Sequence, residues 1–207
     1  KSLDALPTLQ SGTNQANAIF EIVNASLIEI LGGQARRVRF AKNPPTVIML
    51  AGLQGAGKTT LAHEIYLALS LQMSVNVFHM DDLYDGWDNA LGEDLTKVLR
   101  YLADQHKENR PAKFKKYNWM TSSFEESEQI APADLLILEG VGSGDKELQD
   151  DLAALIWIDI DPEIGVKRVI DRDGAQVADE MKKWLGTQQK YFSQHSTREK
   201  ADFILTT

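Results

Sequence analysis

The sequence predicts an α/β fold in which a five-stranded parallel sheet carries helices on both faces and is preceded by an N-terminal helix. Five short apolar runs recur along the chain, and they are mostly continuous, as in strands covered on both faces. Four segments with helical periodicity lie between these runs. Regular alternation of strands and helices is typical of a parallel sheet.

Residues 1–45 are expected to form a separate N-terminal part. The stretch Lys1–Gln15 lacks clear periodicity and predicts a loosely held lead-in. From Ala16 to Leu31, apolar residues recur at helical spacing and a Gly-Gly pair follows, which predicts a helix with a C-terminal stop. The segment Gln34–Pro45 is rich in arginine and ends in two prolines, which predicts a basic connector into the first strand.

Residues 46–207 are expected to form one domain that binds a nucleoside triphosphate. Its strands are predicted at Thr46–Ala51, Val75–Met80, Leu135–Glu139, Ala153–Ile160 and Asp202–Leu205. Its helices are predicted at Lys58–Leu71, Leu91–Gln105, Asp161–Asp171 and Gln176–Gln194. The third of these helices has a capping aspartate followed by proline at its first position, which is a favourable helix start.

The amino-acid composition and net charge limit the kinds of molecule that the chain is expected to bind. The 207 residues carry a formal net charge of −8, which argues against nucleic acid or an anionic membrane surface as the main partner. Cysteine is absent, so the chain has no disulfide and no thiolate metal site, and a reducing cytoplasmic setting is expected. No apolar stretch approaches the roughly 20 residues of a membrane span. The oligomeric state stays open.

A glycine-rich loop carries the strongest functional signal. The stretch Gly52–Thr59 fits the pattern Gly-x-x-x-x-Gly-Lys-Thr, directly after a predicted strand and before a predicted helix. Such a P-loop turns backbone N–H groups and a helix N-terminus toward phosphates, whereas the alternative is a plain strand-to-helix turn. Lys58 is expected along the β and γ phosphates, and Thr59 on magnesium. The expected nucleotide-binding residues are Gly52, Gln54, Gly55, Ala56, Gly57, Lys58, Thr59 and Thr60.

Acidic residues follow two of the predicted strands, at the edge where parallel sheets bind ligands. Asp81 comes first after its strand and is the candidate base for a substrate hydroxyl, or a magnesium ligand through water. Glu139 ends a four-residue apolar run, which is the Walker B pattern of a magnesium-binding carboxylate. Thr59, Asp81 and Glu139 together are expected to surround one hard cation. The alternative for each acid is a helix cap or a solvated turn.

Cations and aromatic residues complete the candidate site. Arg168 and Arg172 are candidates for neutralising the transferred phosphate, and a solvated helix face with local ion pairs is the alternative. Tyr84, Trp87, Tyr117, Trp119 and Trp184 are candidates for stacking on a ring-shaped substrate or for filling the core, with Tyr84, Tyr117 and Trp119 as the expected substrate residues. For Trp184, which lies at a helical core position, the core is expected.

From about Tyr66 to the C-terminus the chain resembles the uridine kinase-like P-loop kinases. The stretch 80–84, Met-Asp-Asp-Leu-Tyr, is similar to the family's Asp-x-x-Tyr segment, in which the Asp is the catalytic base and the aromatic residue contacts substrate. Segments 117–119 and 138–140 resemble the family's Tyr-Asp-Phe segment and Glu-Gly strand end, and Arg168 and Arg172 resemble its lid arginines. The resemblance implies ATP- and Mg²⁺-dependent phosphoryl transfer to a small-molecule hydroxyl. Asn118 replaces the family's Asp, and Ser122 stands where a substrate-binding His is expected.

Residues from about Ile22 to Ala62 instead resemble the signal recognition particle GTPase, including the stretch from Ala41 to Thr60. That family's Asp-Thr-Ala-Gly-Arg strand end and its Thr-Lys-x-Asp guanine motif are both missing. A chain that joins two such segments suggests a chimera, natural or engineered. The alternative function is therefore a nucleotide-binding domain without turnover, either a fragment of a signal recognition particle-type GTPase or a recombined scaffold.

Overall fold

The computed structural model describes residues 38, 41, 45–126 and 129–207. The predicted N-terminal lead-in, the helix at Ala16–Leu31 and most of the basic connector lie outside these residues. The five predicted strands are confirmed as one sheet in which every pair is parallel, in the order β2-β5-β1-β6-β7. Their bounds are β1 Thr46–Gly52, β2 Val75–His79, β5 Leu135–Glu139, β6 Ala154–Asp159 and β7 Phe203–Thr206.

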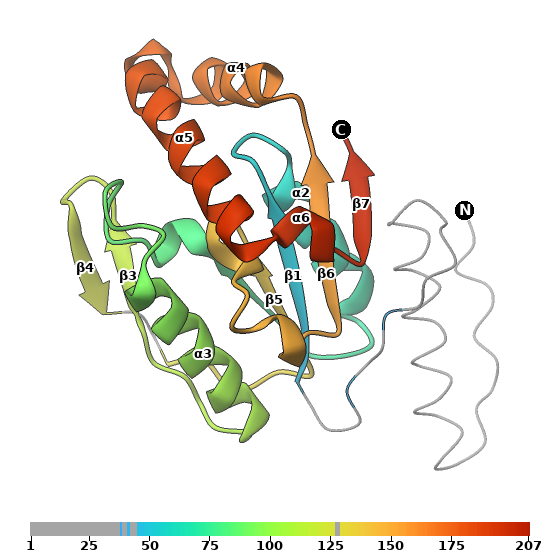
Figure 1. Cartoon of the computed structure of the whole chain (residues 1–207). Helices are drawn as coiled ribbons and strands as arrows, with labels where there is room; N and C mark the ends of the chain where they lie inside the picture. Colours follow the sequence, from blue (N-terminus) through green and yellow to red (C-terminus); the bar gives the residue numbers. More distant parts are fainter. Residues whose placement is uncertain (1–37, 39–40, 42–44, 127–128) are drawn as a thin grey trace, which may run out of the picture.

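Helices cover both faces of this sheet. Figure 1 shows α3 and α5 on the face toward the viewer and α2 on the far face. The α-helices are α2 Lys58–Leu69, α3 Glu93–Lys107, α4 Pro162–Asp173, α5 Ala178–His195 and the short α6 Thr197–Lys200. Short 3₁₀ turns are η1 Met80–Asp82, η2 Val141–Gly144, η3 Gln149–Asp151 and η4 Ala175–Val177. Among the described residues no helix is long and apolar enough to cross a membrane.

The burial of the central strands explains why their sequences are continuously apolar. Every residue of β1 and β5 is buried, because helices cover the sheet from both sides. The strands at the two edges of the sheet are less buried, and β7 exposes Ile204. The central strands therefore form the middle of the core, and the loops after β1 and β5 extend from their carboxyl ends.

A β-hairpin interrupts the alternation and was not predicted. Its strands, β3 Lys115–Asn118 and β4 Ser123–Glu126, pair with each other in a separate two-stranded sheet. The Asn118 side chain stabilises the turn, because its Oδ1 accepts hydrogen bonds from the amides of Met120 at 2.9 Å and Thr121 at 3.2 Å. The indole nitrogen of Trp119 donates to the Asp81 carbonyl oxygen at 2.9 Å, which fixes the hairpin beside η1.

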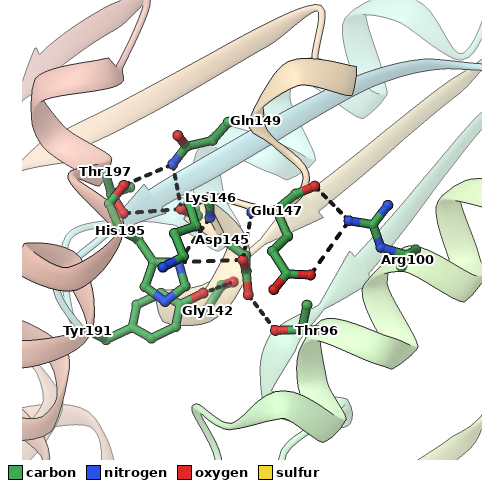
Figure 2. Close-up of polar contacts among 11 residues, drawn as sticks. Thr96, Arg100, Gly142, Asp145, Lys146, Glu147, Gln149, Tyr191, His195 and Thr197 are labelled. Carbon is green, nitrogen blue, oxygen red and sulfur yellow. Dashed lines mark hydrogen bonds and ion pairs between the residues drawn. The ribbon is translucent and has the colours of Figure 1, made fainter.

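A buried carboxylate ties α3 and α5 to the loop after β5. Figure 2 shows Asp145 between Thr96 of α3 and His195 of α5. Asp145 accepts a 2.5 Å hydrogen bond from the Thr96 hydroxyl and a 2.9 Å bond from the Glu147 amide, and it lies 3.4 Å from His195 Nδ1. Burial alone would raise the pKa of this carboxyl, but contacts with His195, Thr96 and the Glu147 amide lower it to about 2.

Candidate functional site

The loops after β1, β2 and β5 meet at the carboxyl edge of the sheet, as expected for a parallel sheet. They enclose a cavity of about 180 Å³, called here the phosphate cavity. It brings together predicted site residues from four separate parts of the chain. These are Gln54, Gly55, Gly57, Lys58, Thr59, Thr60, Asp81, Glu139, Arg168 and Arg172. Gly52, which ends β1, and the buried Ala56 support the loop but do not line the cavity.

The phosphate loop has the backbone that its glycines allow. Gly55 and Gly57 have φ of 83° and 91°, in the left-handed region that favours glycine. A Cβ on Gly55 would overlap the Gly165 carbonyl oxygen of α4, whereas a Cβ on Gly57 would meet nothing. Position 55 therefore requires glycine both for its φ and for its close packing against α4, whereas position 57 requires glycine for its φ alone. Helix α2 begins directly after the loop, at Lys58, and directs its N-terminus into the phosphate cavity.

Lys58 is held inside the loop. Its side chain is 6% exposed, and its Nζ donates to the Leu53 carbonyl oxygen at 2.9 Å. Burial lowers the pKa of Lys58 to about 8, although Glu139 and Asp81 act in the opposite direction. An ammonium group that has lost much of its hydration is ready to exchange one carbonyl partner for phosphate oxygens.

The two acids lie together in the phosphate cavity. Asp81 is open to solvent there, yet the surrounding protein partly desolvates it, and this desolvation, with repulsion from Glu139, raises the pKa of its carboxyl. Glu139 is buried, and its Oε1 accepts a 3.0 Å hydrogen bond from the Thr59 hydroxyl. The same oxygen contacts His79 Nδ1, and that hydrogen bond raises the pKa of His79.

The oxygen atoms present suit a magnesium ion bound mainly through water and phosphate. Thr59 and Glu139 are already within hydrogen-bond distance, and Asp81 lines the same cavity. Within the described ranges no cluster of three or more acidic, histidine or cysteine side chains could hold a metal by itself. Mg²⁺ commonly keeps several waters and uses only one or two carboxylates besides phosphate oxygens. A hydroxyl and two carboxylates therefore fit this ion.

The two arginines both reach the phosphate cavity from α4. Arg172 forms a two-point ion pair with Asp173, with 2.7 Å for each hydrogen bond. Arg168 lies 3.4 Å from the Gly55 carbonyl oxygen, with a similarly long contact to the Thr207 hydroxyl. Both side chains are exposed. Arg168 has only these long contacts and is free to turn toward a bound anion, whereas Arg172 would exchange its ion pair with Asp173 for one with the anion.

A second cavity of about 150 Å³, called here the acceptor cavity, adjoins the first and shares Gln54, Asp81 and Arg172 with it. Four aromatic residues, Tyr84, Trp87, Trp119 and Trp184, form much of its wall. The remaining lining residues are Val169, Asp173, Val177 and Met181. Trp184 is 3% exposed, so its predicted burial is confirmed, but it also lines this cavity. Tyr117 lines neither cavity and packs its ring on Trp119, with 5.0 Å between centroids.

Two contributors to the site were not predicted from the sequence. Gln188 of α5 is buried, and its Oε1 accepts a 2.6 Å hydrogen bond from the Gln54 amide of the phosphate loop. His79 of β2 contacts the Glu139 carboxylate through its Nδ1. Trp184 and Gln188 lie one turn apart on α5, so helical spacing predicts that they share one face of the helix. It does not predict Gln54, the partner of Gln188, which lies 134 positions away in the sequence.

Comparison with known proteins confirms the first resemblance. Residues 84–185 match the Phosphoribulokinase / Uridine kinase family. The chain is 29% identical to a uridine kinase of Lactobacillus johnsonii over 185 residues, which cover 78% of this chain and 86% of that protein. A solved structure described as a possible uridine kinase from Bacillus stearothermophilus has 19% identity and a TM-score of 0.60. It covers 92% of this chain and 99% of that one, and so supports the fold.

The second resemblance is confirmed for a short N-terminal segment. The chain is 55% identical to the signal recognition particle protein of Mycobacterium leprae over 64 residues, or 31% of this chain. It spans only 12% of the length of that protein. Two parts of one chain thus match two different families, which is consistent with a chimera. The kinase matches support phosphoryl transfer in general.

Proposed function

Because residues 84–185 match the phosphoribulokinase and uridine kinase family, we propose that this chain transfers the γ-phosphoryl group of ATP to a hydroxyl of a small molecule. The observation that carries the proposal is the position of Asp81, which lines both the phosphate cavity and the acceptor cavity. A base at that junction can accept the proton of the acceptor hydroxyl as the oxygen attacks the phosphorus.

The charges around Asp81 support this assignment. The surrounding protein and the nearby Glu139 raise the pKa of Asp81, which makes its carboxylate a stronger base than an ordinary exposed aspartate. Lys58 and Arg172 supply positive charge where the transferred phosphoryl group becomes more negative. Arg168, which reaches the same cavity, would bind phosphate oxygens from the α4 side.

Thr59 and Glu139 would hold Mg²⁺, with Asp81 contributing through water. When bound, the ion supplies charge neutralisation and orients the β and γ phosphates. Tyr84 and Trp119 are proposed as walls for the acceptor, and Tyr117 as the residue that supports Trp119.

The test is ADP formation from ATP and Mg²⁺, with and without a panel of small alcohols. We expect one acceptor class to stimulate ADP formation and Asp81→Asn to lower kcat by about 10² to 10⁴, the usual contribution of a general base. Asp85→Asn is the matched control, because Asp85 is exposed in the same loop and lines neither cavity. Unchanged kcat in Asp81→Asn would overturn the base assignment.

A second candidate is a nucleotide-binding domain without turnover. The observation that favours it is the 55% identity to a signal recognition particle protein over 64 residues, compared with 29% identity to a uridine kinase over 185 residues. Tight ATP binding without transfer to any acceptor would support this candidate, and a preference for guanine would support its GTPase version.

A further inference from the structure

We propose that the acceptor is a compact alcohol with a cationic alkylammonium group, bound by an aromatic cage of Tyr84, Trp87, Trp119 and Trp184. This inference rests on the proposed kinase function and specifies its acceptor. It is drawn from four properties of the acceptor cavity: its ring geometry, its polar groups, its charge and its size.

The rings face the cavity from different directions. Consecutive rings of the cage lie 5.2 to 5.7 Å apart between centroids and are inclined to each other by 58° to 76°. A planar base is held best between two nearly parallel faces, whereas steeply inclined rings touch a rounded group on several sides at once. Aromatic cages of this kind are the usual binding site of quaternary ammonium groups, which are attracted to the negative ring faces.

Hydrogen-bonding groups are few and lie mainly toward the phosphate side. Gln54, Asp81 and Arg172 line both cavities and so mark that side of the acceptor cavity. Asp173 lines the acceptor cavity alone, and its carboxylate is occupied by Arg172. The Trp119 indole N–H is already used by the Asp81 carbonyl oxygen. Asn118, which precedes it, directs its amide into the hairpin turn and toward Glu125. A nucleoside or a sugar would bury several polar groups here without partners, and that is costly.

The charge of the cavity suits a cation. Asp173 neutralises Arg172 by the two-point ion pair, which leaves the carboxylate of Asp81 as the uncompensated charge of these three lining residues. The triphosphate of the proposed co-substrate would add further negative charge in the adjoining cavity. An alkylammonium group beside it gains Coulomb energy that a neutral alcohol does not.

The size of the cavity sets the limit on the acceptor. The acceptor cavity has a volume of about 150 Å³. Sites for drug-sized ligands are usually about 300 to 1,000 Å³. A two-carbon alcohol that ends in a trimethylammonium group suits this volume, with its hydroxyl at Asp81 and its rounded cationic end among the rings.

The experiment compares choline with dimethylbutanol, in which a carbon atom replaces the quaternary nitrogen and the shape stays the same. We expect kcat/KM to be about tenfold higher for choline, because the two acceptors differ chiefly in their attraction to the rings and the carboxylate. Equal values for the two alcohols, or a higher value for uridine or glycerol, would overturn the proposal.

Trp87→Leu tests the cage itself, because Trp87 is 39% exposed and its replacement should leave the fold intact. We expect it to lower kcat/KM for choline by about tenfold and for dimethylbutanol by less than about threefold, whereas Trp87→Phe should restore most of the loss. Tyr66→Leu, an exposed aromatic of α2 outside both cavities, is the control. An equal loss for both alcohols would overturn the role of the cage in binding the cation.

A chain that is not a kinase would give a different result from a kinase whose acceptor is not an alkylammonium alcohol. If no alcohol stimulates ADP formation although ATP binds, the proposed function is wrong. Calorimetric titration of choline and dimethylbutanol into the protein with a non-hydrolysable ATP analogue then judges the cage separately. Choline binding that Trp87→Leu weakens about tenfold would support the cage, and absence of choline binding would overturn it.

Discussion

Lys58 occupies an unusual electrostatic position for an ammonium group. Lys58 is almost fully buried, and among the described residues its direct hydrogen-bond partner is a neutral carbonyl oxygen, that of Leu53, at 2.9 Å. Burial lowers the pKa of Lys58 to about 8, while Glu139 and Asp81 limit the decrease and Arg172 adds to it. At neutral pH the group is still mostly protonated, but modest alkalinity removes its charge.

Nucleotide binding should therefore be linked to proton uptake. A triphosphate favours the charged form of Lys58 and raises its pKa above about 8, so ATP binding near pH 8 should take up a fraction of one proton. Affinity should fall as the pH rises above about 8, by up to tenfold for each pH unit. Titration calorimetry in two buffers with different ionisation enthalpies measures the uptake. Lys58→Arg should abolish it, because arginine does not titrate in this range, and uptake that persists in this variant would assign the proton to another group.

Single residues differ in how far the sequence could predict them. The phosphate loop, Asp81 and Glu139 could be predicted to lie at one edge of the sheet, where they line one cavity, because fixed spacing and strand ends set their positions with little dependence on the rest of the fold. Gln188 could not be found, because its partner Gln54 lies on another element far away in the sequence. Trp184 was predicted as a core residue, and it is both buried and a cavity wall, a combination that periodicity does not reveal.

At the scale of elements, α5 connects the functional cavities to the rest of the fold. Its Gln188 side chain holds the phosphate loop, and its C-terminal turn contacts the Asp145 network (Figure 2). The Tyr191 hydroxyl of the same helix donates to the Gly142 carbonyl oxygen at 2.9 Å, close to the end of β5. The positions of the phosphate loop and of the loop after Glu139 are thus both coupled to one helix.

Asp145 should contribute strongly to the stability of this arrangement. Its folded pKa of about 2 is below the ordinary value of 3.8, so its contribution is complete above about pH 4 and is lost as the pH falls toward 2. The difference corresponds to about 2 kcal/mol of unfolding free energy at neutral pH. Asp145→Asn should lose about that amount in urea unfolding at pH 7 and almost nothing near pH 2.

Asp150→Asn, at an exposed position in η3, is the matched control and should change stability by less than about 0.5 kcal/mol. A loss in Asp145→Asn that is the same at pH 7 and at pH 2 would mean that packing, rather than the charge, is responsible.

The main elements were predictable and the hairpin was not. The five strands of the sheet agree with their apolar runs to within about two residues, because burial on both faces imposes a continuous apolar sequence. Strand β3 has the sequence Lys-Lys-Tyr-Asn, too short and too polar for a strand signal. The hairpin depends on a turn that Asn118 stabilises and on the contact of Trp119 with Asp81, and neither can be read from local periodicity.

The whole molecule places the phosphate loop at the centre of one sheet. Strand β1 pairs with β5 on one side and with β6 on the other, so the strand before the loop has neighbours from the part of the chain that resembles kinases. If the two parts have different origins, their junction lies inside one shared core. Residues 46–126 and 129–207 are therefore expected to unfold as one cooperative unit to which nucleotide binding is linked.

Nucleotides should raise the melting temperature of the whole molecule, and GTP should not do so more than ATP. The phosphate cavity is lined by residues suited to phosphates, and the guanine motif Thr-Lys-x-Asp is absent from the sequence. At about 100 times the Kd, a bound nucleotide adds about 2.7 kcal/mol, or roughly 5 to 10 °C for a domain of this size. AMP, which lacks the β and γ phosphates, should have little effect, and Lys58→Ala should remove most of the shift for ATP and GTP alike. A clearly larger shift with GTP in differential scanning fluorimetry would contradict the kinase proposal, because recognition of guanine would then have survived in a chain that lacks its usual motif.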